Sequence, residues 1–333
     1  MGFEARLSRE VWSASPLAVL SFALVLLVAC SDANDGGAAG NAQDGGTTAD
    51  GASPPKNDSG KTDAATTEDD GSVTPPDPDS GIVTPDSGPT PTQGCGGTAA
   101  KGRKVVTIDV SGQQRTYLRD VPSSYTGSEP LALVFAYHGY GCDHTCMQDM
   151  GMQDATAGHA IFIIPDGQPQ PDQGNAKGWN ESPTSNDVAM FDAVLASIST
   201  EYCVDKNRVY AVGFSWGGWM STALGCLRGN SLKGFASVEG GTQNKAKDCK
   251  GAVAAFINHD KSDPAEPFSS GEHSRDFFLT LNAASNPAAY NAPSPCVRYE
   301  GTAPVVWCTP NAGTHEWPSY ANADVFQKFF GIH

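Results

Sequence analysis

Basic side chains are scarce in this chain. Its 333 residues include 21 Lys and Arg against 37 Asp and Glu, which gives a formal net charge of −16 at pH 7. A nucleic-acid-binding protein needs a basic surface, and so does a protein that docks by charge on an anionic membrane. The composition therefore argues against a nucleic-acid partner and against electrostatic membrane docking.

A hydrophobic run long enough to cross a membrane, about 20 helical residues, is also missing. The apolar run Leu17–Ala29 has 13 residues and follows Arg6 and Arg9. A short run behind positive charge is typical of a targeting signal. It ends in Leu27-Val28-Ala29-Cys30, which resembles the lipobox of bacterial lipoproteins. We predict a lipoprotein signal peptide at residues 1–29 and lipidation of Cys30; an ordinary secretory signal and an uncleaved membrane anchor are the alternatives.

Aromatic residues are absent from residues 31–94, where the apolar side chains other than Ala are Val73, Ile82 and Val83. The segment holds 12 acidic and 2 basic residues. Such a composition cannot bury enough apolar area to offset the entropy of ordering. We predict that residues 30–94 are a lipidated Cys and a disordered, self-repelling spacer. The expected location is lipid-anchored at the bacterial cell envelope, with the outer membrane favoured, or extracellular, and the anchor is the expected membrane contact.

Eight of the nine cysteines follow the spacer, between Cys95 and Cys308. An even number in an exported chain predicts up to four disulfides. Cys296 and Cys308 flank a predicted hairpin and are the pair we favour. The segment Cys142-Asp-His144-Thr-Cys146 is an alternative zinc site, but no second Cys/His cluster supports it. We expect neither a metal nor an organic cofactor.

Residues 95–333 are predicted to form one folded domain. Residues 104–121 alternate between polar and apolar around Ser111-Gly112, as in an antiparallel hairpin. Beyond them, short apolar runs suit strands buried on both faces of a sheet, and apolar side chains at intervals of three or four mark helices. The predicted strands are 104–110, 114–121, 131–137, 160–165, 208–214, 233–238, 252–258 and 305–307, and the predicted helices are 187–202, 219–227, 272–281 and 323–330. This order predicts an α/β three-layer sandwich with an antiparallel N-terminal hairpin and a mostly parallel central sheet.

The segment Gly213-Phe214-Ser215-Trp216-Gly217 matches the pattern G-x-S-x-G. It follows a predicted strand and precedes an amphipathic helix, which is the setting of a nucleophile elbow. Glycines on both sides of Ser215 give the strained turn the space that it needs. The alternative is a strand-to-helix turn whose Ser only caps the helix.

A serine nucleophile needs a base to accept its proton, and a histidine after Ser215 is expected. His315 lies in a turn-rich loop after the last predicted strand, from which an imidazole can reach back to Ser215. His273 falls in a predicted helix, His333 is the last residue, and His259 belongs to the acid loop described next. His315 is therefore the predicted base.

The base needs a carboxylate that orients the ring and stabilises its cation. The strand at 252–258 runs into His259-Asp260-Lys-Ser-Asp263, so either Asp260 or Asp263 can serve. We favour Asp263 because the acid usually projects from the loop beyond the strand, and Asp260 can instead cap the turn.

The oxyanion hole needs two backbone N–H groups that point at the developing charge. One is expected from Trp216, directly after the nucleophile, and the other from Tyr140, in the loop after the strand at 131–137. His138 in that loop is predicted to be structural. Trp179 and Trp317 are predicted to bind substrate, because flat rings stack well on planar acyl groups and on sugars.

Residues 95–333 resemble the extracellular polyhydroxybutyrate depolymerase and feruloyl esterase group of the α/β-hydrolase superfamily, which is similar to carbohydrate esterase family 1. The resemblance implies a triad of Ser215, Asp263 and His315. It departs from the family pattern at Asp260, where Gly is usual, at Glu266, which replaces an apolar residue expected beneath the triad, and at the large Trp216. The segments that carry the resemblance are Cys95-Gly96, Arg115-Thr-Tyr117, Val121-Pro122, His138-Gly139, Gly178-Trp179-Asn180, Asn186-Asp187-Val188, Tyr202-Cys203-Val204-Asp205, Arg208-Val-Tyr210, Gly213 to Gly218, Ser274-Arg275-Asp276, Cys296-Val-Arg-Tyr299 and His315-Glu-Trp317-Pro318.

These observations predict a surface-tethered, monomeric serine carboxylesterase that acts through an acyl-enzyme. The expected substrates are polymeric or small extracellular esters, with feruloyl or acetyl esters of polysaccharides favoured. The alternatives are a polyhydroxyalkanoate depolymerase, a serine peptidase of the same superfamily and a non-catalytic binding lipoprotein on a hydrolase scaffold.

Overall fold

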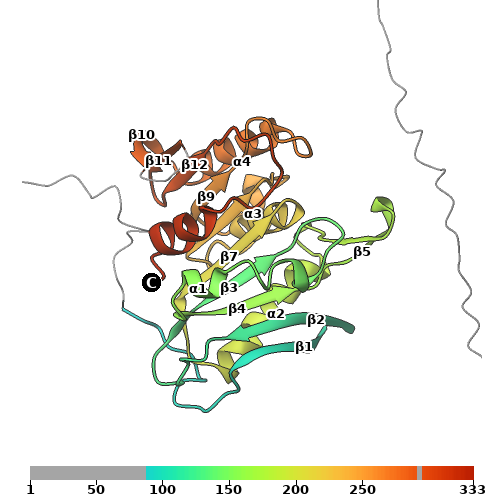
Figure 1. The fold of residues 1–333 in the computed structure, drawn as a ribbon, viewed down its shortest axis with the longest axis vertical. Helices are drawn as coiled ribbons and strands as arrows, with labels where there is room; N and C mark the ends of the chain where they lie inside the picture. The colour runs from blue at the N-terminus through green and yellow to red at the C-terminus, as the bar shows by residue number, and fades with distance from the viewer. Residues whose placement is uncertain (1–87, 291–294) are drawn as a thin grey trace, which may run out of the picture. The chain divides into compact units, whose positions relative to one another are not determined.

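The computed structural model describes residues 88–290 and 295–333. The predicted signal peptide, Cys30 and residues 31–87 of the predicted spacer lie outside the described residues. Within them, ten strands form one sheet in the order β1-β2-β4-β3-β7-β8-β9-β12-β11-β10 (Figure 1). The strands are β1 (Gly102–Val110), β2 (Gln113–Val121), β3 (Leu131–Tyr137), β4 (Ala160–Pro165), β7 (Val204–Phe214), β8 (Gly234–Val238), β9 (Ala254–Asn258), β10 (Ser285–Tyr290), β11 (Cys296–Glu300) and β12 (Val305–Cys308).

The sheet is antiparallel at both edges and parallel in the middle. β1 and β2 form the predicted hairpin, with Gly102 opposite Val121, and β2 then pairs antiparallel with β4. From β4 through β3, β7, β8 and β9 to β12 each pair is parallel. β11 and β10 close the far edge as antiparallel strands. The central strands are apolar runs because both of their faces are buried.

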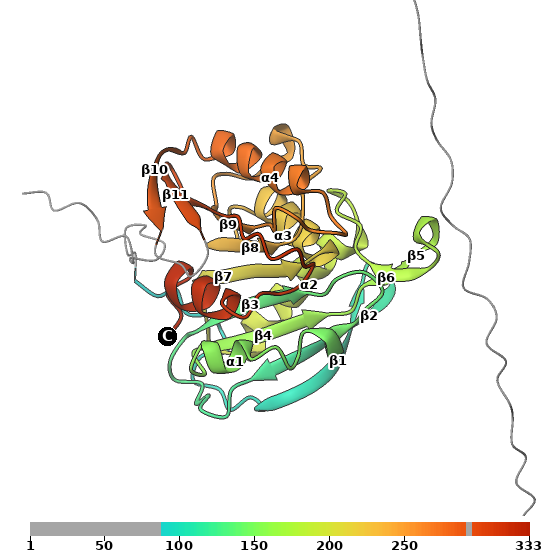
Figure 2. The same ribbon diagram turned by 45° about the horizontal axis from the view of Figure 1, so that its top comes forward.

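Helices cover both faces of the sheet. Side chains of α2 (Asn186–Glu201), α3 (Trp216–Leu227) and α4 (Phe268–Leu281) share one apolar cluster with alternate residues of the central strands. The other residues of those strands form a second cluster with α1 (Met152–Ala155) and η4 (Ala323–Phe329), a helix of π type. Figure 2 shows η4 in red on the face of the sheet opposite α3. The predicted three-layer α/β sandwich is confirmed.

Some elements have little signal in the sequence. The edge strand β10 consists of SNPAAY, mostly exposed, and carries neither an apolar run nor a clean alternation. A small antiparallel pair, β5 (Gln168–Gln170) and β6 (Ala176–Gly178), is joined by a 3₁₀ turn, η2 (Pro171–Gln173). Two further 3₁₀ turns are η1 (His144–Cys146) and η3 (Ala246–Asp248). The local sequence pattern therefore does not predict these segments.

Residues 88–94, assigned above to the spacer, contact the domain at the start of β7. Thr92 is 6% exposed, and its backbone N–H donates to Val204 O at 3.1 Å while its hydroxyl donates to Tyr202 O. Thr90 N donates to the side chain of Asp205. The folded domain therefore includes residues before the expected boundary at Gly94.

The eight cysteines of the described residues form four disulfides. The predicted bridge between Cys296 and Cys308 is present and links β11 to β12. The sulfur atoms of Cys142 and Cys146 are bonded to each other, so these two residues do not offer zinc the pair of thiolates that the alternative required. The other two bridges are Cys95–Cys203 and Cys226–Cys249.

In the part of the chain that the structure describes, no helix is both long enough and apolar enough to cross a bilayer.

Candidate active site

Ser215 lies in the sharp turn between β7 and α3. Its backbone has a φ of 55°, which few residues with a side chain adopt. The glycines around it are required by space, because a Cβ at Gly213 would overlap the carbonyl of Gly217, and one at Gly217 would overlap the carbonyl of Tyr137. Ser215 N donates to Val238 O at 2.8 Å, so β8 supports the turn. The strand–turn–helix setting predicted for the motif is present.

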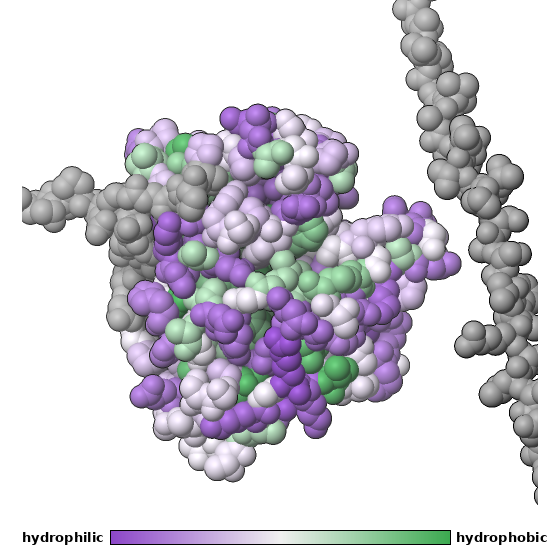
Figure 3. Space-filling view, in the orientation of Figure 1, coloured by the Kyte–Doolittle hydropathy of each residue, from purple (hydrophilic) through white to green (hydrophobic). Residues whose placement is uncertain are grey.

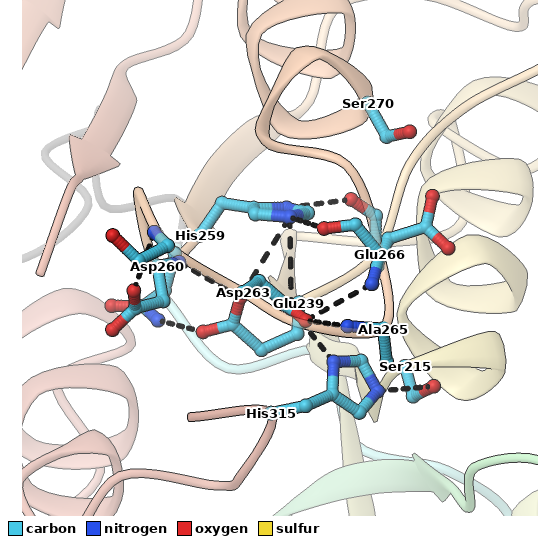
Figure 4. A network of polar contacts seen from close by, with 12 residues as sticks. Ser215, Glu239, His259, Asp260, Asp263, Ala265, Glu266, Ser270 and His315 are labelled. Atoms are coloured by element: carbon cyan, nitrogen blue, oxygen red, sulfur yellow. Dashed lines mark hydrogen bonds and ion pairs between the residues drawn. The ribbon is translucent and has the colours of Figure 1, made fainter. Parts of the chain in front are cut away.

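Three of the predicted residues meet in one hydrogen-bonded chain. Figure 4 shows His315 between Ser215 and Asp263. The His315 ring is 2.8 Å from Ser215 Oγ through Nε2 and 2.6 Å from Asp263 Oδ2 through Nδ1. Because a carboxylate only accepts hydrogen bonds, Nδ1 carries the proton and Nε2 is free to accept the serine hydroxyl. The loops after β7, β9 and β12 supply the three side chains at one end of the parallel strands.

The Asp263 side chain is fully buried and is held as the anion. Its Oδ1 accepts from the N–H groups of Ala265 at 2.7 Å and Glu266 at 3.0 Å. Burial raises the pKa of Asp263, but hydrogen bonds from Glu266 N–H, the His315 ring, Ala265 N–H and Glu239 outweigh it, so the pKa is lowered. A charged carboxylate at this place can stabilise an imidazolium.

Asp260, the competing acid, faces away from His315. Its carboxylate accepts from the backbone N–H groups of Ser262, Ala312 and Gly313. These bonds join the β9 loop to the loop that carries His315. Asp260 therefore caps its turn, as the alternative proposed, and the geometry of an acid partner belongs to Asp263.

The backbone around Ser215 fits an oxyanion site. Trp216 is the first residue of α3, where N–H groups lack intrahelical acceptors and the helix dipole is positive. The loop that contains Tyr140 lies beside the nucleophile, since a Cβ at Gly139 would be 3.3 Å from the Ser215 Cβ. The structure thus brings both predicted donor segments to Ser215.

His138 is a buried structural residue of this loop. Gly167 N donates to its Nε2 at 2.9 Å, which leaves Nδ1 to donate to Gly139 O at 2.8 Å. Burial lowers the pKa of His138. Trp179 supports the same loop through a hydrogen bond from Nε1 to His138 O and is only 2% exposed. Trp179 thus reaches the cavity from the core and fixes the loop.

Two cavities meet at Ser215. The first, of about 480 Å³, is lined by Tyr140, Trp216, Trp219, Glu181, Gln243 and their neighbours. The second, of about 610 Å³, is lined by Gly139–Cys142, Cys146, Phe214, Ala265 and His315. In Figure 3 the face turned to the viewer is mainly hydrophilic, and a more hydrophobic band crosses it toward the β5–β6 hairpin.

An aromatic wall borders the first cavity. The Tyr140 and Trp216 rings are stacked, with 5.7 Å between centroids and 13° between planes. Tyr140 is 60% exposed, and its hydroxyl donates to Gln173 O. Trp216 Nε1 donates to Glu181 Oε1 at 2.8 Å. Burial raises the pKa of Glu181 to about 7, against the Trp216 hydrogen bond that lowers it.

Two other residues lie differently from the expectation. Trp317 contacts the apolar cluster beneath η4 and donates from Nε1 to Asn322 Oδ1. The described residues that line the two cavities do not include Trp317. The geometry therefore does not support the substrate-binding role predicted for it. Glu266 borders both cavities, whereas the family pattern expects an apolar side chain beneath the triad at this position.

Two groups of described side chains bring three possible metal ligands within 4.8 Å of one another. In the group of Asp143, His144 and Asp166, Lys177 Nζ is 2.9 Å from Asp143, and the His144 ring is 2.8 Å from Asp166. The second group is Glu239, His259 and Asp263, which already belongs to the triad's hydrogen-bond network. The expectation of no metal stays a prediction.

Two carboxyl groups of the site were not anticipated, Glu181 in the first cavity and Glu239 behind Asp263. Glu239 directly follows β8, and ligands and catalytic groups gather at this end of parallel strands. The position of Glu239 after a predicted parallel strand was the signal that could have identified it as a site residue. Glu181 gives no comparable signal, because only its contact with Trp216 reveals it.

Comparison with known proteins agrees with this geometry. The chain is 30% identical over 209 residues to feruloyl esterase D of Neurospora crassa, covering 58% of this chain and 68% of the relative. It is 31% identical over 186 residues to a probable feruloyl esterase C of Aspergillus niger, covering 54% and 66%. The chain thus spans about two thirds of the length of these relatives.

The fold also has solved counterparts. The acetyl xylan esterase from Aspergillus awamori superposes with a TM-score of 0.56 at 13% identity, over 70% of this chain and all of that one. A family model described as phospholipase/carboxylesterase matches residues 125–299, more than half of the chain. The chain therefore belongs to the phospholipase/carboxylesterase family of α/β-hydrolases.

Proposed function

We propose that the protein is a serine carboxylesterase that works through an acyl-enzyme. The observation that carries the proposal is the continuous chain from Ser215 through His315 to Asp263. His315 Nε2 accepts the hydroxyl proton as Ser215 Oγ bonds to the ester carbonyl carbon. The carbonyl oxygen becomes an anion facing the N–H groups of Trp216 and Tyr140, and Asp263 stabilises the imidazolium.

The same residues complete the turnover. As the carbonyl re-forms, the bond to the alcohol oxygen breaks, and His315 gives its proton to that oxygen. Water then enters, loses a proton to His315 and adds to the acyl carbon. Cleavage of the bond to Ser215 Oγ, with return of the proton, releases the acid and restores the hydroxyl.

We assign one half of the ester to each of the two cavities. The leaving alcohol must lie beside His315 to receive its proton, and His315 lines the second cavity. The acyl group then extends into the first cavity, along Trp216. The stacked rings of Tyr140 and Trp216 suit a planar acyl group, and Glu181 offers a hydrogen-bonding partner to a polar ring substituent.

We therefore favour aromatic acyl esters of polysaccharides, such as feruloyl esters, over acetyl esters as the substrate class. The relatives named as feruloyl esterases support this choice, and the acetyl xylan esterase shares the fold. A short aliphatic polyester suits a narrow apolar groove instead, and the polar side chains Gln170, Gln173 and Gln243 border the first cavity. Trp179 also lines the first cavity.

We also propose that the protein is exported and held at the cell envelope through a lipid on Cys30. The four disulfides support export, because such bridges persist in oxidising compartments. The anchor rests on the sequence alone. Replacement of Cys30 by Ser is expected to move the full chain from the membrane fraction to the soluble exported fraction, and a Cys30→Ser protein that still sediments with membranes would refute the anchor.

Ser215→Ala tests the activity. Hydrolysis of 4-nitrophenyl acetate and methyl ferulate should fall by roughly 10⁶ in kcat, and labelling by a serine-directed phosphonate should disappear. Ser123→Ala, at an exposed serine in another part of the domain, is the matched control. If Ser215→Ala keeps more than about a thousandth of the wild-type rate, Ser215 is not the nucleophile.

A substrate comparison tests the class. We expect kcat/KM on methyl ferulate to exceed that on acetylated xylan and on hydroxybutyrate oligomers. A tenfold preference for the oligomers, about 1.4 kcal/mol in the transition state, would overturn the assignment of the acyl cavity.

A further inference from the structure

Glu239 is a buried carboxyl group directly after β8. Its side chain is 2% exposed, and its backbone has a φ of 52°. This left-handed conformation favours glycine, and two glycines, Gly240 and Gly241, follow it in the sequence. The chain nevertheless places a Glu at this position, which indicates a role for the side chain.

The Glu239 carboxyl is fixed by the elements around the triad acid. Asn258 Nδ2 donates to its Oε1 at 3.1 Å, and Asp260 N donates to its Oε2 at 2.8 Å. One oxygen of this carboxyl, one oxygen of Asp263 and a ring nitrogen of His259 lie within 4.8 Å of one another. Glu239 and Asp263 are therefore adjacent buried carboxyl groups.

Two carboxyl groups in contact inside a protein share a proton, because adjacent buried negative charges repel strongly. Asp263 is the better anion of this pair, since it accepts from two backbone N–H groups and from the His315 ring. A hydrogen bond between two carboxyl groups requires one donor. The proton therefore belongs to Glu239.

Burial and the neighbouring acidic groups agree with this assignment. Burial, the hydrogen bond with Asp263, and the charges of Asp263 and Asp260 raise the pKa of Glu239 to about 9, although Asp260 N–H lowers it. The basic ring beside the pair is His259, whose Nε2 is 3.8 Å from each carboxyl. Its two nitrogens also face the carbonyl oxygens of Gly240 and Glu266.

We propose that Glu239 is a positioning residue of the triad, whose protonated carboxyl donates a hydrogen bond to Asp263 and holds that carboxylate against His315 with a single negative charge. The inference rests on the proposed esterase function and adds a fourth member behind the acid. Glu239 acts through Asp263 and touches neither substrate nor nucleophile.

The arrangement predicts an alkaline limit to activity. As Glu239 loses its proton near pH 9, the donated hydrogen bond disappears and two carboxylates face each other. Asp263 is then pushed away from the position in which it orients His315. The titratable groups around this pair are Asp260 and His259, at the end of β9, and His315, in the loop after β12.

Two substitutions test the proposal. Glu239→Gln keeps a donor at nearly the same position but cannot ionise, and Glu239→Leu removes the donor. We expect Glu239→Gln to retain wild-type kcat within about threefold and to lose the decline near pH 9, whereas Glu239→Leu loses about tenfold or more in kcat at unchanged KM. Retention of the alkaline decline in Glu239→Gln, or wild-type kcat in Glu239→Leu, would overturn the proposal.

The controls separate folding and function from positioning. Asp324→Asn neutralises another fully buried carboxyl whose burial also raises its pKa, and its pH profile should match the wild type. If Glu239→Leu does not fold, the ¹³C titration of the Glu239 carboxyl in Ser215→Ala decides, and an apparent pKa below 6 contradicts the proposal. If the phosphonate labels the Ser215→Ala protein as well as it labels the wild type, the esterase function itself is refuted.

Discussion

Replacing Asp263 by Asn tests the acid assignment most directly, because the structure dictates how the amide would lie. Asp263 Oδ1 accepts from two backbone N–H groups, Ala265 at 2.7 Å and Glu266 at 3.0 Å. The amide oxygen of Asn must take this place, since an NH₂ group would face two donors. The amide nitrogen is then directed at His315, where Oδ2 lay 2.6 Å from Nδ1.

An NH₂ group at that position cannot accept from Nδ1–H. The ring responds by placing its proton on Nε2, which can no longer accept the Ser215 hydroxyl. A wrong tautomer in such a triad lowers kcat by about 10⁴, or about 5.5 kcal/mol at 1.36 kcal/mol per tenfold. Folding changes little, because the side chain keeps its volume and its two backbone bonds.

Asp260→Asn is the matched comparison. Asp260 is 2% exposed and accepts N–H groups from Ser262, Ala312 and Gly313. An amide nitrogen there would leave at least one buried donor unsatisfied, a loss of about 1–3 kcal/mol. For a domain of this size the Tm should fall by about 2–4 °C for each kcal/mol, while kcat falls by tenfold or less.

Initial rates of 4-nitrophenyl acetate hydrolysis and thermal melts by circular dichroism measure both effects. Asp263→Asn should be at least about a hundredfold slower than Asp260→Asn, and Asp260→Asn should have the lower Tm. The opposite ranking of rates would show that Asp260 is the acid.

Other features give further expectations. The pKa of Glu181 is raised to about 7 from 4.5, so its neutral form favours folding. The difference in Tm between the wild type and Glu181→Gln should therefore fall as the pH rises from about 4.5 to 7. A difference that does not change with pH would contradict the burial of this carboxyl. Arg115→Met leaves the buried Asp187, 2.6 Å from the guanidinium, without its cation. The free energy of unfolding measured in urea should fall by about 3–5 kcal/mol. Adding Asp187→Leu to Arg115→Met should largely restore it. Removing the Cys95–Cys203 bridge, with a separation of 108 residues, should lower the free energy of unfolding by up to about 4.7 kcal/mol, and an unchanged urea midpoint would refute this.

The sequence predicts the centre of this site better than its surroundings. Ser215 and His315 could be identified because one is in a local motif and the other is the loop histidine after the last strand. Asp260 and Asp263 are three residues apart, and contacts with residues some fifty positions later in the chain distinguish them. His315 bonds to Asp263, whereas Ala312 and Gly313 bond to Asp260. Such contacts have no local pattern.

The limits elsewhere have the same cause. Trp317 and Trp179 are both tryptophans near predicted loops, yet one packs beneath η4 and the other supports His138. Residue type indicates an aromatic ring and not the direction in which it points. The central strands were predictable because burial on both faces requires apolar runs, whereas β10 is exposed except at Tyr290 and has no such run.

The contacts of residues 88–94 lie at the end of β7 opposite the catalytic opening. These residues join the domain where β7 begins, at Val204, and Ser215 follows the last residue of β7. The 11 residues of β7 separate the two points by roughly 35 Å at about 3.3 Å per residue. Preceding chain therefore enters at one pole of the sheet and substrate at the other. An enzyme attached through its N-terminal side would therefore be tethered at the pole opposite its catalytic opening, so the attachment would not obstruct the entry of a polymeric substrate.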